Sequence, residues 1–90
     1  MKTRDEALAL LRQYNDNDAL LKHAYAVEAV MRRFAARFGE DVEYWGLVGL
    51  LHDIDYQKWP EEHLQVAPRL LRDAGFDEAF VRAVCAHGYG

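Results

Sequence analysis

Cysteine is almost absent from this 90-residue chain, which has Cys85 and no other. A single cysteine excludes an intrachain disulfide and a cysteine-based zinc knuckle. Long apolar runs are also missing, since no stretch approaches the roughly 18 residues that a transmembrane helix needs. The opening residues 1–6 lack the apolar segment of a signal peptide. These absences predict a cytoplasmic protein with no membrane partner.

Positive charge is in deficit, with 11 lysines and arginines against 15 acidic residues and a net charge of −4. Nucleic-acid binding usually needs a basic face, so we expect no nucleic-acid partner. Nucleotides remain open as ligands because a bound metal can supply the positive charge that phosphates require. The length suggests one domain with a modest core.

Helical signals are frequent and no segment shows sustained strand alternation, which predicts an all-α bundle of about five helices. Thr3 and Glu6 form a capping-box pattern ahead of a helix at about 4–14. Turn, cap and proline positions predict the bounds of the other helices. The second should run to Gly39, and the third should begin after a cap at Asp41. The fourth should run from Pro60 to Gly75 with a kink or break near 64–68, and the fifth should begin at Asp77.

Apolar residues of the second expected helix recur at spacings of three and four, which predicts one buried face made of Leu20, Ala24, Val27, Met31, Phe34 and Phe38. His23 lies four residues before Val27, so we expect it to point inward with that stripe. The third helix is apolar on every side, which predicts a central position. Gly46 and Gly49 in this helix would let a neighbouring helix approach closely.

Polar chemistry follows the third helix at once, in His52, Asp53 and Asp55. A buried polar group needs a partner, and carboxylates at the partly negative C-terminus of a helix are unfavourable unless a cation binds there. Three further histidines come from other helices or their ends: His23, His63 and His87. Imidazole and carboxylate are ligands of first-row transition metals, so a metal site with Asp53 at its centre is one interpretation.

The same residues also have plain structural explanations. His23 would be a hydrogen-bonded core histidine, His63 an exposed helix residue, and His87 a cation at a helix C-terminus. Asp55 would simply end the helix, and the His-Asp pair would share a hydrogen bond without a metal. From spacing alone, the two interpretations are evenly balanced.

With these residues, the sequence resembles the HD-domain superfamily of metal-dependent phosphohydrolases, in particular small bacterial proteins with a His-Asp-Ile-Gly motif. The likeness runs through residues 21–24, 49–56, 62–63 and 86–90, and so covers nearly the whole chain. The resemblance implies that His23, His52 and Asp53 bind a metal. It also implies that Asp53 bridges to a second ion held by His63 and His87.

Two features depart from the family pattern. Asp55 stands where the motif has glycine, a change that leaves the expected ligands intact. The final aspartate ligand of the family has no counterpart after His87. We therefore expect residues 1–90 to be the N-terminal part of an HD-type helical domain, or to hold an incomplete site.

The resemblance implies hydrolysis of a phosphate ester, with a nucleotide as one candidate substrate. Asp53 would orient or deprotonate the attacking water, and Lys58 would contact a substrate phosphate, although a solvated loop lysine is the commoner role. One or two divalent ions are expected, namely Fe, Mn, Zn, Ni or Co, with Mg also compatible. The alternatives are a non-catalytic module that binds a metal or nucleotide, and an assembly domain that forms a homodimer through uncovered apolar faces.

Overall fold

A computed structural model describes residues 2–62 and 65–87, without the side chains of Glu62 and His87. Its regular structure is α1 (Arg4–Tyr14), α2 (Asp18–Phe38), α3 (Val42–Leu51), the short 3-10 helix η1 (Pro60–Glu62), α4 (Ala67–Asp73) and α5 (Glu78–His87). These residues contain five α-helices and no strand, which confirms the predicted fold class. None of the helices described is long and apolar enough to cross a membrane.

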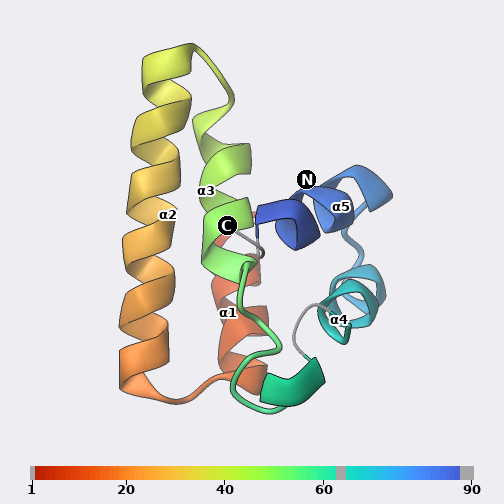
Figure 1. Cartoon of the computed structure of the whole chain (residues 1–90). Coiled ribbons are helices and arrows are strands. Elements are labelled where there is room, and N and C mark those ends of the chain that lie inside the picture. Colours follow the sequence, from red (N-terminus) through yellow and green to blue (C-terminus); the bar gives the residue numbers. More distant parts are fainter. Residues whose placement is uncertain (1, 63–64, 88–90) are drawn as a thin grey trace.

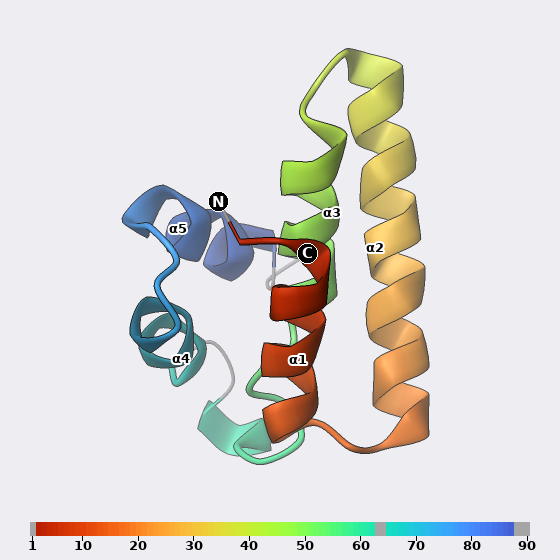
Figure 2. The same ribbon diagram turned by 180° about the vertical axis from the view of Figure 1, so that it is seen from behind.

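The helix α3 is the centre of the fold. It packs against α1, α2 and α5, with α2 running alongside it and α4–α5 on its other side (Figure 1). The view from behind shows α1 lying against α3 between these two parts (Figure 2). Every residue from Gly46 to Leu51 is buried. The prediction that this all-apolar helix is central is therefore confirmed.

Local signals set the helix ends where the sequence predicts them. Thr3 accepts a hydrogen bond from the N–H of Glu6, whose carboxylate accepts one in return from the N–H of Thr3. Asp41 caps α3 by accepting from the N–H of Tyr44. Gly39 ends α2 with a φ of 70°, the left-handed conformation that glycine adopts without a steric cost.

The helix expected from Pro60 to Gly75 is divided. Pro60 opens only the single 3-10 turn of η1, and α4 begins at Ala67, with Pro68 in its first turn. A proline is tolerated there because the first N–H groups of a helix have no partner within the helix. A turn and a bend at residues 65–66 agree with the predicted break, while residues 63 and 64 lie outside the described part.

The predicted buried face of α2 is wrong toward the C-terminal end of the helix. Phe34 and Phe38 are 48% and 63% exposed, and Val30 is also exposed. The residues of α2 that are buried are Ala24, Glu28 and Ala35. At the glycines of α3 the two helices approach closely, with Arg32 against Gly46 and Met31 and Glu28 against Gly49. The helix therefore turns Glu28, Met31 and Ala35 toward the core, rather than Phe34 and Phe38.

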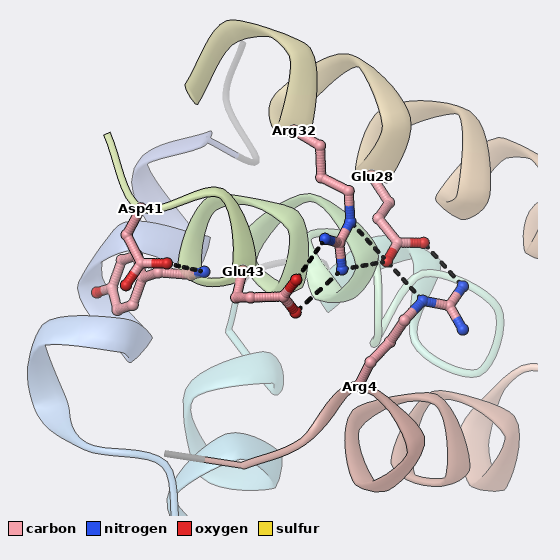
Figure 3. Close-up of polar contacts among 6 residues, drawn as sticks. Arg4, Glu28, Arg32, Asp41 and Glu43 are labelled. Carbon is pink, nitrogen blue, oxygen red and sulfur yellow. Dashed lines mark hydrogen bonds and ion pairs between the residues drawn. The ribbon is translucent and has the colours of Figure 1, made fainter. Parts of the chain in front are cut away.

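A buried carboxylate links the first three helices (Figure 3). Glu28 is only 5% exposed, and it accepts hydrogen bonds of 2.7 and 2.9 Å from Nε and Nη2 of Arg4 on α1. Arg32 contacts Glu28 at 3.3 Å and Glu43 of α3 at 3.0 Å. Burial raises the pKa of the Glu28 carboxyl, but its hydrogen bonds and ion pairs with Arg4 and Arg32 outweigh this effect and lower the pKa below its ordinary value.

Candidate metal centre

Three potential metal ligands converge where α2 passes the end of α3. His23 lies in the second turn of α2, His52 caps the C-terminus of α3, and Asp53 follows directly. One ligand atom from each residue lies within 4.8 Å of the other two. The structure therefore brings together the three residues that the family resemblance assigns to a first metal ion.

A backbone carbonyl orients the imidazole of His52. Its Nδ1 lies 2.7 Å from the carbonyl oxygen of Gly49, one turn earlier in α3. Since a carbonyl oxygen can only accept, Nδ1 carries the hydrogen and donates it. Nε2 is then the nitrogen directed at Asp53, and a histidine held in this way through one nitrogen presents the other to a metal.

One carboxylate oxygen of Asp53 faces both imidazoles. Its Oδ2 lies 3.1 Å from Nε2 of His52 and 3.4 Å from Nε2 of His23. The two rings are tilted by 53°, with their centroids 5.3 Å apart. Two ligand atoms that each lie ~2.1 Å from a tetrahedral ion are ~3.4 Å from one another. The spacing of Oδ2 from both nitrogens therefore fits a shared ion.

The surroundings of His52 favour positive charge on its ring. Burial lowers the pKa of the imidazole, but the hydrogen bond and negative charge of Asp53, together with the carbonyl of Gly49, outweigh burial and raise the pKa above its ordinary value. A proton or a metal ion can supply this charge at Nε2. The site is thus electrostatically suited to a cation.

The prediction that His23 points inward is wrong, because its side chain is 53% exposed. The core-facing positions of α2 are Ala24 and Glu28, so His23, one position before Ala24, lies toward the outer side of the helix. His23 nevertheless reaches Asp53 from the outer side of the helix. The candidate site therefore has a buried side at His52 and a solvent-accessible side at His23.

The other predicted site residues are not placed in this cluster. Lys58 is exposed, and its Nζ lies over the ring of Tyr14, 5.5 Å from the centroid. His63 lies outside the described residues, and His87 is the last residue of α5, with a side chain that is not described. A second ion and a phosphate contact by Lys58 therefore remain predictions.

Residues of the α1–α2 loop hold the segment that follows Asp53. The buried Asn15 donates from Nδ2 to the carbonyl oxygen of Ile54 at 2.8 Å. Gln57 accepts from the N–H groups of Asp16 and Asn17, both at 3.0 Å. These bonds join the His-Asp segment to the loop that leads into α2. The sequence alone does not reveal this role of the loop, because its partners lie about 40 residues away.

Asp55 is an anchor rather than a simple helix stop. Its side chain is fully buried, and its Oδ2 accepts from the N–H of Ala67 at 3.0 Å. This N–H is at the first residue of α4, where Val66 provides no side-chain cap. The aspartate that replaces the glycine of the family motif therefore ties the metal-centre segment to α4.

Comparison with known families agrees with this geometry. A model of the HD domain matches residues 20–90, which include the three clustered residues and well over half of the chain. No curated protein and no solved structure gives a significant match. HD domains bind divalent metals and are generally hydrolases. Together with the all-α fold and the His-Asp pair at the end of its central helix, this match shows that the chain belongs to the HD-domain family.

Proposed function

We propose that this chain hydrolyses a phosphate ester at a divalent transition metal held by His23, His52 and Asp53. The observation that carries the proposal is the convergence of two imidazoles and one carboxylate within 4.8 Å. Membership of the HD-domain family supports hydrolysis as the reaction class. A nucleotide is one candidate substrate.

The donor set suits the proposed ion. Two imidazole nitrogens and one carboxylate oxygen are ligands of Zn, Fe, Mn, Co or Ni, whereas Mg prefers oxygen ligands alone. Three protein ligands also leave at least one coordination position open, as catalytic metal sites require. When bound, such an ion supplies Lewis acidity toward phosphoryl oxygens and lowers the pKa of water.

The protein residues have separate roles in this proposal. The carbonyl of Gly49 holds His52 so that Nε2 faces the site. Asp53 places Oδ2 between the two imidazoles, where it would bind the ion, and its second carboxylate oxygen would take a proton from an attacking water. The exposed side chain of His23 marks the side from which a substrate can enter.

A second ion, bridged by Asp53 and held by His63 and His87, extends the proposal, as does contact between Lys58 and a substrate phosphate. Stoichiometry tests the second ion. Two equivalents of metal in the wild-type chain, falling to one in His63→Ala and His87→Ala, would support it. One equivalent in all three proteins would refute it.

Lys58→Met should raise KM more than it lowers kcat if the lysine binds substrate.

Elemental analysis of protein purified without chelator tests the primary site. We expect at least one equivalent of transition metal in the wild-type chain, and loss of that ion in His52→Ala. Arg33→Ala, a change at an exposed position of α2 outside the cluster, is the control and should retain the metal. Phosphate release from a panel of nucleotides and simple phosphoesters should follow metal content.

Two results would contradict this function in different ways. A wild-type chain that binds none of Zn, Fe, Mn, Co or Ni would refute the metal site. A chain that binds metal stoichiometrically but releases no phosphate across the panel would instead support the non-catalytic binding module.

We also propose that the chain forms a homodimer, on the evidence of the exposed apolar residues along α2. Val30, Phe34 and Phe38 are each about half exposed or more, and the rings of the two phenylalanines stack with centroids 6.1 Å apart. Exposed apolar patches often mark association surfaces. Light scattering across a concentration series tests the dimer, and a strictly monomeric chain would contradict it.

A further inference from the structure

We propose that Gly49 is a positioning residue of the metal centre, because its missing side chain sets the spacing between the helix that carries His23 and the helix that ends at His52. The inference rests on the proposed metal site and concerns what keeps its ligands at the distance that a shared ion needs. Gly49 itself would contact neither metal nor substrate.

At Gly49, α2 and α3 approach so closely that no side chain fits between them. A Cβ built there would lie 2.8 Å from Cγ of Met31, 3.0 Å from the carbonyl oxygen of Val27 and 3.2 Å from Cα of Glu28. Two of these three atoms belong to the backbone of α2. A side chain can rotate away from such a contact, but backbone atoms can yield only if the helix moves.

A movement of α2 at this point would reach the ligands directly. Val27 and Glu28 lie four and five residues after His23, which is about 6–7.5 Å along the helix axis. The backbone of α2 lies along α3, and α2 also meets α1 through the side chain of Arg4. The distance between the two helices at Gly49 therefore controls the distance from His23 to Asp53, which is 3.4 Å.

The buried carboxylate of Glu28 limits how α2 could escape a clash. Both of its oxygens accept hydrogen bonds from Arg4 of α1, at 2.7 and 2.9 Å (Figure 3). Rolling α2 about its axis would break these contacts. The expected response to a side chain at Gly49 is thus a translation of α2 away from α3 by a few tenths of an ångström.

Gly46 provides a matched control in the same helix. The three atoms nearest to a Cβ there would all belong to the side chain of Arg32, at 2.7, 2.9 and 3.0 Å. Gly46→Ala and Gly49→Ala make the same chemical change and give the same gain in helix propensity. They differ in whether the backbone of α2 is among the atoms in the way, and Gly49 also accepts a hydrogen bond from His52 through its carbonyl oxygen.

The experiment measures Co²⁺ binding to the wild-type chain, Gly46→Ala and Gly49→Ala, with the visible spectrum of the bound ion as a report on its geometry. We expect Gly49→Ala to weaken binding about 10-fold and to alter the spectrum. A loss of this size is common when a residue that orients metal ligands without binding the metal is replaced. Gly46→Ala should stay within about 2-fold of wild type. Wild-type affinity and spectrum in Gly49→Ala would overturn the inference.

Adding Met31→Ala to Gly49→Ala separates side-chain crowding from helix displacement. We expect no rescue, since the contacts with Val27 and Glu28 remain. Full rescue of affinity and spectrum would show that Met31 alone caused the defect, and would overturn the inference.

A readout in the metal-free protein separates this inference from the proposed function. The rings of His23 and His52 are 5.3 Å apart, close enough for a nuclear Overhauser effect between their protons. The effect should weaken in Gly49→Ala and persist in Gly46→Ala, even if the wild-type chain proves not to bind metal. Equal intensities in both variants would refute the spacing role.

A second variant covers the case in which Gly49→Ala does not fold. Ala24 is buried on the face of α2 that packs against α3, beside His23. Ala24→Val should widen the same interface from the side of α2, without the clash that Gly49→Ala makes with the backbone of that helix. It should weaken both Co²⁺ binding and the nuclear Overhauser effect between the rings of His23 and His52. An unchanged site in this variant would contradict control by helix spacing.

Discussion

The pair of Arg4 and Glu28 allows burial to be tested separately from hydrogen-bond geometry. Arg4 donates to both oxygens of Glu28, at 2.7 and 2.9 Å, and Arg72 donates to both oxygens of Glu78, at 2.7 and 3.0 Å. The two pairs have nearly the same geometry. They differ in environment, since the Glu28 carboxylate is buried and both partners of the second pair are exposed.

Replacing each arginine by methionine removes the charge and keeps most of the apolar stem. In Arg4→Met the Glu28 carboxylate stays buried with only the longer contacts to Arg32, of 3.3 and 3.4 Å. Loss of one partner of a buried pair costs ~3–5 kcal/mol. Because Arg32 remains and Arg4 is itself partly solvated, we expect a loss of about 2 kcal/mol in the free energy of unfolding.

That loss is large for a chain of this size. At ~0.05–0.15 kcal/mol per residue, the whole free energy of unfolding would be about 5–13 kcal/mol. Urea unfolding followed by circular dichroism should resolve the change, and thermal unfolding should show a fall in Tm of roughly 8–16 °C. Arg72→Met should change stability little, since exposed ion pairs contribute little. The reasoning is refuted if Arg4→Met is no more destabilising than Arg72→Met.

Three further predictions concern stability. The folded pKa of Glu28 lies below its unfolded value, so the stability that this group contributes at neutral pH should be lost as the pH falls from the ordinary glutamate range through the folded pKa. Unfolding measured by circular dichroism at decreasing pH should show a smaller loss of stability in Arg4→Met than in the wild-type chain. Parallel curves for the two proteins would contradict the role of Glu28 in this pH dependence. Asn15→Leu removes hydrogen bonds to the buried carbonyls of Leu11 and Ile54 and should cost about 2 kcal/mol in urea unfolding, whereas a neutral result would mean that water satisfies them. Gly39→Ala adds a Cβ with nothing within 4 Å, so only the strain of its φ of 70° should appear, at about 1 kcal/mol; a stabilised variant would disprove that strain.

The helix ends were predictable because their signals are local. The caps at Thr3, Asp41 and Gly39 each depend on residues within a few positions in the chain. The His-Asp pair was found for the same reason, since an imidazole and a carboxylate that follow an apolar helix stand out without any knowledge of the fold. The sequence therefore predicted the fold class and the central position of α3.

Which face of α2 points toward the core could not be predicted, because it depends on contacts between residues far apart in the sequence. Spacing alone favours Phe34 and Phe38 as core residues, but the buried residues of α2 are Ala24, Glu28 and Ala35. The burial of Glu28 depends in turn on Arg4, 24 residues earlier. The anchoring role of Asp55 was missed in the same way, because its partner Ala67 lies 12 residues later.

The burial of α3 on all sides affects how this sequence can vary between relatives. A substitution anywhere from Gly46 to Leu51 disturbs a packed neighbour, whereas Lys22, Ala26 and Arg33 on the outer side of α2 contact mainly solvent. A mutational scan should therefore find low tolerance around His52 and at Ala24, and high tolerance at exposed positions beside His23 such as Lys22 and Ala26. Two ligands of one proposed ion would then be under different constraints: the surroundings of His52 would stay nearly constant, and the exposed neighbours of His23 would be free to diverge with the substrate.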